Sequence, residues 1–340
     1  MTYFYYFIQR SKTKKRDTIN IGYNSCIKTR LTMSKRPTLL QHFRSFAYQN
    51  NIRDFDKALA YFTVFGGTGW DVDLSKGLDA LIEEKVLRNY EPLHKSMTRY
   101  THNNPVYHML LSLVALGVNH EHDAFKKAKV GRDRGEEAMD YLEKKSLLRF
   151  DLSVEEPLKE SDGKSDRVMF ELPFMRFWFA LISPHYKSIS AGDFSEFEQE
   201  WHKIRDNFSI LLSNQLVLEL VKKSVAEKFA DDPIISIGSY YDKHVQIEIL
   251  AKRKSGKMLA GECKYSKEAA KINMLNSLKE KCQKSELDIA DYVLFSKNGF
   301  TSEVEQIKDD NITCLSQCHL SSLLDNLSED DLLVYTNKKY

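Results

Sequence analysis

Charged residues interrupt two apolar segments in the C-terminal third of the chain. The segment V-Q-I-E-I-L-A (245–251) reads as a strand with Glu248 between two isoleucines. The segment M-L-A-G-E-C-K-Y (258–265) reads as the next strand, in which Glu262 and Lys264 are two residues apart and share a face. A carboxylate inside a sheet is costly unless it is paired or bound to a metal. The pattern therefore predicts a site at these three residues.

Two carboxylates and a lysine on neighbouring strands are typical of a magnesium site that acts on a phosphodiester. Mg²⁺ prefers oxygen ligands, which Glu248, Glu262 and the peptide carbonyl of Cys263 would supply. Mg²⁺ or Mn²⁺ would acidify a water molecule, and Lys264 would orient that water or stabilise charge on the phosphorus. The competing interpretation is a structural ion pair between Glu248 and Lys264 in an unrelated α/β domain.

The elements around these residues alternate between helix and strand. A helix over 212–229 should precede the first strand, and the alternation in the second strand should put Gln246, Glu248 and Leu250 on one side. The order α-β-β-β-α-β-α-β predicts an α/β domain with a mixed sheet. The expected strands are 234–241, 245–251, 258–265, 292–296 and 312–316, and the later helices are 267–283 and about 300–307.

The preceding part of the chain is predicted to be mainly helical. Apolar residues recur at helical spacing from Leu39 to Phe65, and Val86, Leu87 and Tyr90 would begin a short extended segment. Residues 126–172 then read as helix, turn, helix and a two-stranded ribbon, the order of a winged helix. The second helix of that unit has basic residues near its ends, which suit DNA phosphates: Arg132, Arg134, Lys144 and Lys145. It also carries acids that would repel phosphate and favour a protein-docking role: Glu136, Glu137, Asp140 and Glu143.

Composition limits the class of protein. The 340 residues are 42% hydrophobic and 29% charged, with a net charge of +2, and contain no apolar run long enough for a membrane span. No nucleotide-triphosphatase motif is present, and the five cysteines with no secretory signal favour a cytoplasmic protein. We expect residues 1–32 to be an unstructured extension, 33–207 to be a helical region with winged-helix units, and 208–330 to be the sheet domain.

The sequence has Glu248, then a predicted hairpin, then Glu262-Cys263-Lys264, and this order resembles the signature of the PD-(D/E)xK nuclease superfamily. The resemblance implies a nuclease-like fold in which Glu248, Glu262 and Lys264 form the catalytic set with Mg²⁺. The superfamily often has a further acid on the preceding helix, and Glu219 is the candidate here, with Glu227 second.

A narrower resemblance covers residues 120–316. It is to the uncharacterised C-terminal domain of archaeal-type DEXX-box ATPases, the domain of unknown function 234, and rests on L-L-R-F, F-E-L-P-F-M-R-F-W-F-A-L-I-S-P, L-E-L-V-K-K, Q-I-E-I-L-A and G-E-C-K-Y-S.

This chain lacks the ATPase half, so a separate ATPase subunit is an expected partner beside DNA. Glu248 also stands where the family usually has Asp, one methylene shorter. The protein is therefore expected to be a nuclease-fold DNA-binding protein, either a magnesium-dependent phosphodiester hydrolase or a non-catalytic DNA-binding or ATPase-docking module. Its oligomeric state is open.

Overall fold

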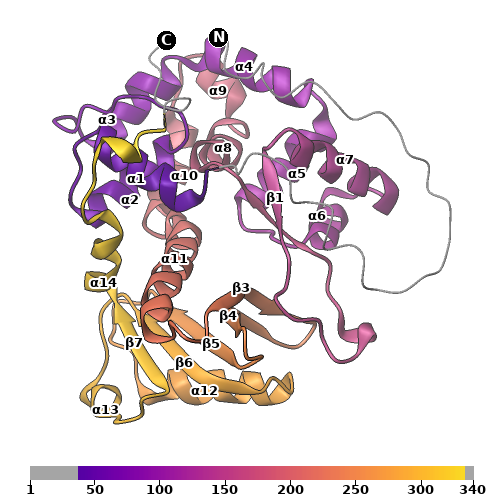
Figure 1. Cartoon of the computed structure of the whole chain (residues 1–340). Helices are drawn as coiled ribbons and strands as arrows, with labels where there is room; N and C mark the ends of the chain where they lie inside the picture. The colour runs from indigo at the N-terminus through magenta and orange to yellow at the C-terminus, as the bar shows by residue number, and fades with distance from the viewer. Residues whose placement is uncertain (1–36, 334–340) are drawn as a thin grey trace.

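The computed structural model describes residues 37–333, so the extension expected over 1–32 lies outside the described residues. A helical part comes first and a sheet with its covering helices follows (Figure 1). The helical part consists of α1 (Leu39–Gln49), α2 (Phe55–Phe65), α3 (Leu78–Ile82), α4 (Tyr90–Thr101), α5 (Pro105–Ala115), α6 (Glu121–Ala128), α7 (Arg132–Lys144), α8 (Pro173–Phe177), α9 (Tyr186–Ser190) and α10 (Ser195–Phe208). Within residues 37–333, no helix has both the length and the apolar character needed to cross a membrane.

A two-stranded antiparallel ribbon, β1 (Leu148–Asp151) and β2 (Arg167–Phe170), follows α7 and reaches down to the sheet (Figure 1). Its connecting loop is hydrogen-bonded to the edge strand β3 (Ile234–Tyr241). The amide of Val154 donates to the Ser239 carbonyl at 2.9 Å, and the Tyr241 hydroxyl donates to the Asp151 carbonyl at 3.0 Å. The ribbon therefore covers an edge that would otherwise expose unpaired strand groups.

The C-terminal sheet has five strands in sequence order. β3, β4 (Gln246–Arg253) and β5 (Met258–Lys264) are antiparallel, whereas β6 (Ile289–Ser296) and β7 (Ile312–Ser316) run parallel to β5. The long helix α11 (Ile210–Lys228) and the helix α12 (Ile272–Lys284) lie on opposite faces of this sheet (Figure 1). The chain continues through α13 (Ser302–Glu305) and α14 (Gln317–Ser321).

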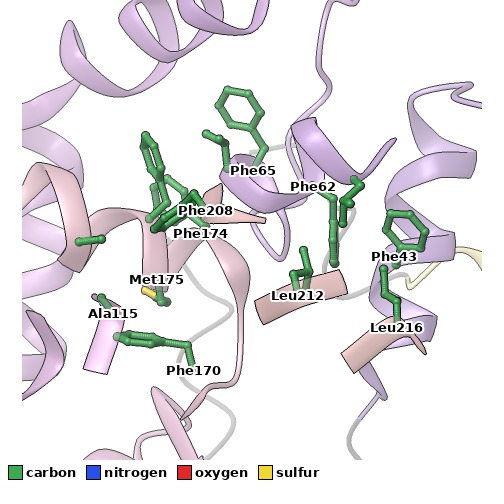
Figure 2. Close-up of a cluster of buried hydrophobic side chains, with 14 of the residues drawn as sticks. Phe43, Phe62, Phe65, Ala115, Phe170, Phe174, Met175, Phe208, Leu212 and Leu216 are labelled. Carbon is green, nitrogen blue, oxygen red and sulfur yellow. The ribbon is translucent and has the colours of Figure 1, made fainter. Parts of the chain in front are cut away.

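The helical part and one face of the sheet share a hydrophobic core. The section shown in Figure 2 draws on α1, α2, α5, β2, α8, α10 and the start of α11, and the same cluster continues through α11 to Ile249, Val293 and Phe295 in the sheet. A second cluster between the sheet and α12 contains Leu250 and Leu278. Because α11 packs on both parts, we expect the helical part and the sheet to unfold together.

The sequence correctly predicted a helical part followed by a five-stranded mixed sheet, including each strand's approximate position. The extended segment expected at Val86–Tyr90 is wrong, because residues 83–87 form a π-helical turn (Glu83–Leu87) before α4. Val86 and Leu87 are buried on the apolar side of that turn, so helical packing accounts for their apolar character. The helix expected from residue 267 begins at Ile272.

Candidate functional site

Glu248 lies where the pairing of strand β4 changes. Gly238 pairs with Leu250 but Tyr240 pairs with Ile247, so β4 carries one extra residue in a bulge there. The ladder from β4 to β5 ends at Ile249 and Gly261. Beyond that point, Glu248 Oε2 accepts a hydrogen bond from the Cys263 amide at 2.9 Å. A side-chain oxygen thus replaces the main-chain carbonyl that a regular ladder would supply.

The bulge also separates side chains that a regular strand would put together. The alternation predicted Glu248 and Leu250 on one side of the sheet, and this is wrong. Leu250 packs in the cluster toward α12, whereas Glu248, Ile249 and Cys263 line a cavity on the α11 side. Bulges re-aim side chains in this way because the extra residue shifts the two-residue alternation.

Glu262 has a partner that was not predicted from the sequence. The Lys281 ammonium on α12 donates to both carboxylate oxygens of Glu262, at 2.7 Å each. Both side chains are mostly buried, with 30% of Lys281 and 20% of Glu262 exposed. One signal in the sequence was available, because Lys281 adjoins the buried apolar face of α12 formed by Leu278 and Cys282.

Lys264 lies at the end of β5, but its ammonium is directed to the backbone. It donates to the Ala269 carbonyl at 3.0 Å, in the loop between β5 and α12. Within residues 37–333, Lys264 forms no ion pair with Glu248 or Glu262. The Glu248–Lys264 ion pair of the competing interpretation is therefore absent from the described part of the chain, and the pair that does form joins Glu262 to Lys281.

The electrostatics of the site are dominated by burial and by the two carboxylates. Burial raises the pKa of Glu248, and the negative charge of Glu262 raises it further, while Lys281 and the Cys263 amide act in the opposite direction. Burial also raises the pKa of the Cys263 thiol well above its usual range, with Glu248 adding to the effect. The thiol therefore stays protonated at neutral pH and is a poor metal ligand.

The acids expected on the preceding helix lie on α11. Glu219 pairs with Lys222 at 2.7 Å and lines the same cavity as Glu248. Glu227 is exposed on α11 and does not line that cavity. The structure thus brings Glu219 and Glu248 to one cavity, while Glu262 is turned toward α12. In residues 37–333 no group of three or more His, Cys, Asp or Glu side chains is arranged to hold a metal ion.

The helix α7, expected to contact DNA or a protein, presents mixed charge. Arg132 and Arg134 are exposed, and Arg132 pairs with Glu136 at 2.7 Å on the same face. The ribbon after α7 is already engaged with β3 through its loop. In this structure, the unit therefore contacts the rest of the chain through its ribbon.

Comparison with known families matches the middle of the chain. The family model DUF234, described as "Archaea bacterial proteins of unknown function", matches residues 178–278. The matched region includes α11, the strands β3 to β5 and the residues Glu219, Glu248, Glu262 and Lys264. No curated protein shows a significant sequence match to the chain. The match confirms the part of the resemblance that concerns this domain of unknown function.

Proposed function

We propose that the sheet domain is a nuclease-like module that binds DNA and hydrolyses its phosphodiester bonds with Mg²⁺ or Mn²⁺. The observation that carries the proposal is the position of Glu248 and Glu262 on neighbouring strands, just beyond the point where the pairing of β4 with β5 ends, where the charge of Glu262 raises the pKa of Glu248. The order of elements from α11 to β6 is also the order implied by the resemblance to PD-(D/E)xK nucleases.

Glu248 and Glu262 would be the protein ligands of the cation. Glu248 accepts a hydrogen bond from the Cys263 amide through Oε2, and the Cys263 side chain is a further hydrogen-bond partner of its carboxylate. Burial and the charge of Glu262 raise the pKa of Glu248, and a cation bound to the carboxylate would act in the opposite direction, as Lys281 already does. Hard cations such as Mg²⁺ bind to one or two carboxylates and complete their shell with water and phosphate oxygens.

The chain's own residues would then have distinct roles. A bound Mg²⁺ or Mn²⁺ would supply an acidified water molecule and polarise the phosphodiester. Glu248 and Glu262 would hold the cation, and Lys281 would have to release Glu262 for this. Lys264 would leave the Ala269 carbonyl to stabilise the charge that develops on the phosphorus. Glu219, on the cavity side, would orient the substrate.

A second candidate is a non-catalytic DNA-binding or ATPase-docking module with the same fold. The contact between Lys281 and both oxygens of Glu262 favours it, because the protein already neutralises this carboxylate without a metal. The separate ATPase subunit would then supply the energy-dependent step.

A plasmid assay distinguishes the two candidates. Supercoiled DNA is incubated with Mg²⁺ or Mn²⁺ and the full chain, the Glu262→Gln variant, or a matched Glu268→Gln control in the exposed loop after β5. Hydrolysis predicts nicking by the wild type and the control but not by Glu262→Gln. A mobility shift without nicking by any of the three proteins would favour the non-catalytic module.

A further inference from the structure

A cavity of about 430 Å³ lies between the helical part and the sheet. Its walls come from α1, α5, the ribbon, α8, α11, β3 and β4, and Glu248 and Cys263 are among its lining residues. Small-molecule sites typically measure roughly 300–1,000 Å³ and combine apolar walls with a few polar groups. The cavity has this size and mixture, and Glu248 of the proposed centre is part of its wall.

One stripe of α11 forms a wall of the cavity. Asn214, Gln215, Leu218, Glu219 and Lys222 all line it, and their spacing places them on one face of the helix. At 1.5 Å per residue, the stripe is about 12 Å long. That length suits a ligand with a phosphate at one end and a ring system at the other.

One cationic group in the wall has unused hydrogen-bonding capacity. Arg149 donates to Gln215 Oε1 at 3.1 Å, and within residues 37–333 no carboxylate lies at ion-pair distance from its guanidinium. The other N–H groups of this guanidinium can therefore donate to an anionic ligand in the cavity.

The charges of the wall are balanced, which limits the kind of ligand. Four cationic and four acidic side chains line the cavity: Arg149, Arg167, Arg176, Lys222, Asp151, Glu171, Glu219 and Glu248. Lys222 is paired with Glu219, Arg167 lies 3.7 Å from Asp151, and Arg176 donates to two backbone carbonyls. Arg149 therefore remains as the available cation. One phosphate and several hydroxyl or amino donors suit such a wall better than a polyphosphate.

We propose that this cavity binds a single nucleotide, with its phosphate on Arg149 and its sugar and base along α11 toward Glu219 and Glu248. A guanidinium binds phosphate through two parallel hydrogen bonds, and carboxylates accept from hydroxyl and amino groups. The nucleotide is either a free mononucleotide or the terminal nucleotide of a strand. The inference rests on the proposed function, because it names the substrate unit that reaches Glu248.

Calorimetric titration of the full chain with dAMP in EDTA tests the site without a metal. We expect Arg149→Gln to weaken dAMP binding roughly tenfold or more, since it removes a charge-assisted pair of hydrogen bonds. The matched control is Arg88→Gln, an exposed arginine before α4 that pairs with Glu83, which should leave the affinity unchanged. Deoxyadenosine, which lacks the phosphate, should bind to the wild type at least as weakly as dAMP binds to Arg149→Gln. Circular dichroism checks the fold of each variant, and Arg149→Lys, which keeps the charge but not the planar fork, replaces Arg149→Gln if that variant unfolds.

Titration with octathymidylate, with and without a 5′-phosphate, shows whether the cavity binds a free mononucleotide or the end of a strand. Tighter binding of the phosphorylated strand than of dAMP identifies a strand end, and the reverse order identifies a free mononucleotide. The inference is overturned if dAMP does not bind, if deoxyadenosine binds equally well, or if the folded Arg149 variant binds dAMP as the wild type does. Plasmid nicking that depends on Glu262 without dAMP binding would remove this inference alone. Binding of dAMP without nicking would remove only the hydrolysis.

Discussion

Replacing Lys281 with methionine tests whether this lysine occupies the place of a metal ion. The substitution keeps the length of the side chain and removes the two 2.7 Å hydrogen bonds to Glu262. Hydrogen bonds to charged groups contribute about 1.5–3 kcal/mol, and the 30% and 20% exposure of the two side chains favours the lower half of that range. In EDTA we therefore expect Lys281→Met to lower the free energy of unfolding by about 2 kcal/mol.

A divalent cation should reverse this loss. Lys281→Met removes the ammonium beside Glu262, while the Glu248 carboxylate stays near enough to interact with that of Glu262, so Mn²⁺ should bind more tightly to the variant than to the wild type. A ligand at one hundred times its dissociation constant stabilises the folded state by about 2.7 kcal/mol. Urea unfolding with and without Mn²⁺ measures both effects. An equal response to Mn²⁺ in Lys281→Met and the wild type would refute the reasoning, and Lys284→Met, in the last turn of α12, serves as the surface control.

Three further predictions concern charged groups elsewhere. Arg44 holds the C-terminal segment to α1 through Asp331, at 2.6 Å and 2.9 Å, so Arg44→Ala should cost about 2 kcal/mol in urea unfolding and speed proteolysis after α14. Asp291→Ala should cost about 3 kcal/mol in the same assay, because it removes the 2.5 Å contact of the Arg253 guanidinium, whose side chain is 6% exposed, and leaves Asp232 at 3.6 Å as its remaining acidic partner. Burial, together with nearby acids, raises the pKa of Glu121 from 4.5 to about 7. Between these two pH values the folded chain keeps the proton on Glu121 and the unfolded chain loses it. The free energy of unfolding therefore falls as the pH rises from 4.5 to about 7. Glu121→Gln should therefore stabilise the chain by about 1 kcal/mol at pH 8 and have almost no effect at pH 4, a difference that thermal unfolding at the two pH values would show.

The strands could be predicted because their local pattern survives folding. Ile247 and Ile249 flank Glu248 in the sequence and mark β4 as an apolar strand. Gly261, before Glu262, lies so close to the neighbouring strands that an added Cβ would be 2.9 Å from the Val293 carbonyl oxygen. The direction of Glu248 could not be predicted, because it depends on a bulge that arises from pairing with β3.

Partners far away in the sequence were also beyond prediction. Lys281 is 19 residues from Glu262 and meets it only because α12 packs under the sheet. Arg149 and Gln215 meet because the ribbon docks beside α11. Local patterns thus identified the acids of the site, whereas their partners depend on how the helical part, the sheet and α12 pack.

The central claim is that Glu248 and Glu262 together hold one divalent cation. Titration of the full chain with Mn²⁺, followed by the electron paramagnetic resonance signal of the free ion, measures this directly. The account predicts one bound Mn²⁺ per wild-type chain and none for the Glu248→Gln/Glu262→Gln double variant, with Glu268→Gln unchanged. Equal binding by the wild type and the double variant, or no binding by the wild type and Lys281→Met alike, would contradict it.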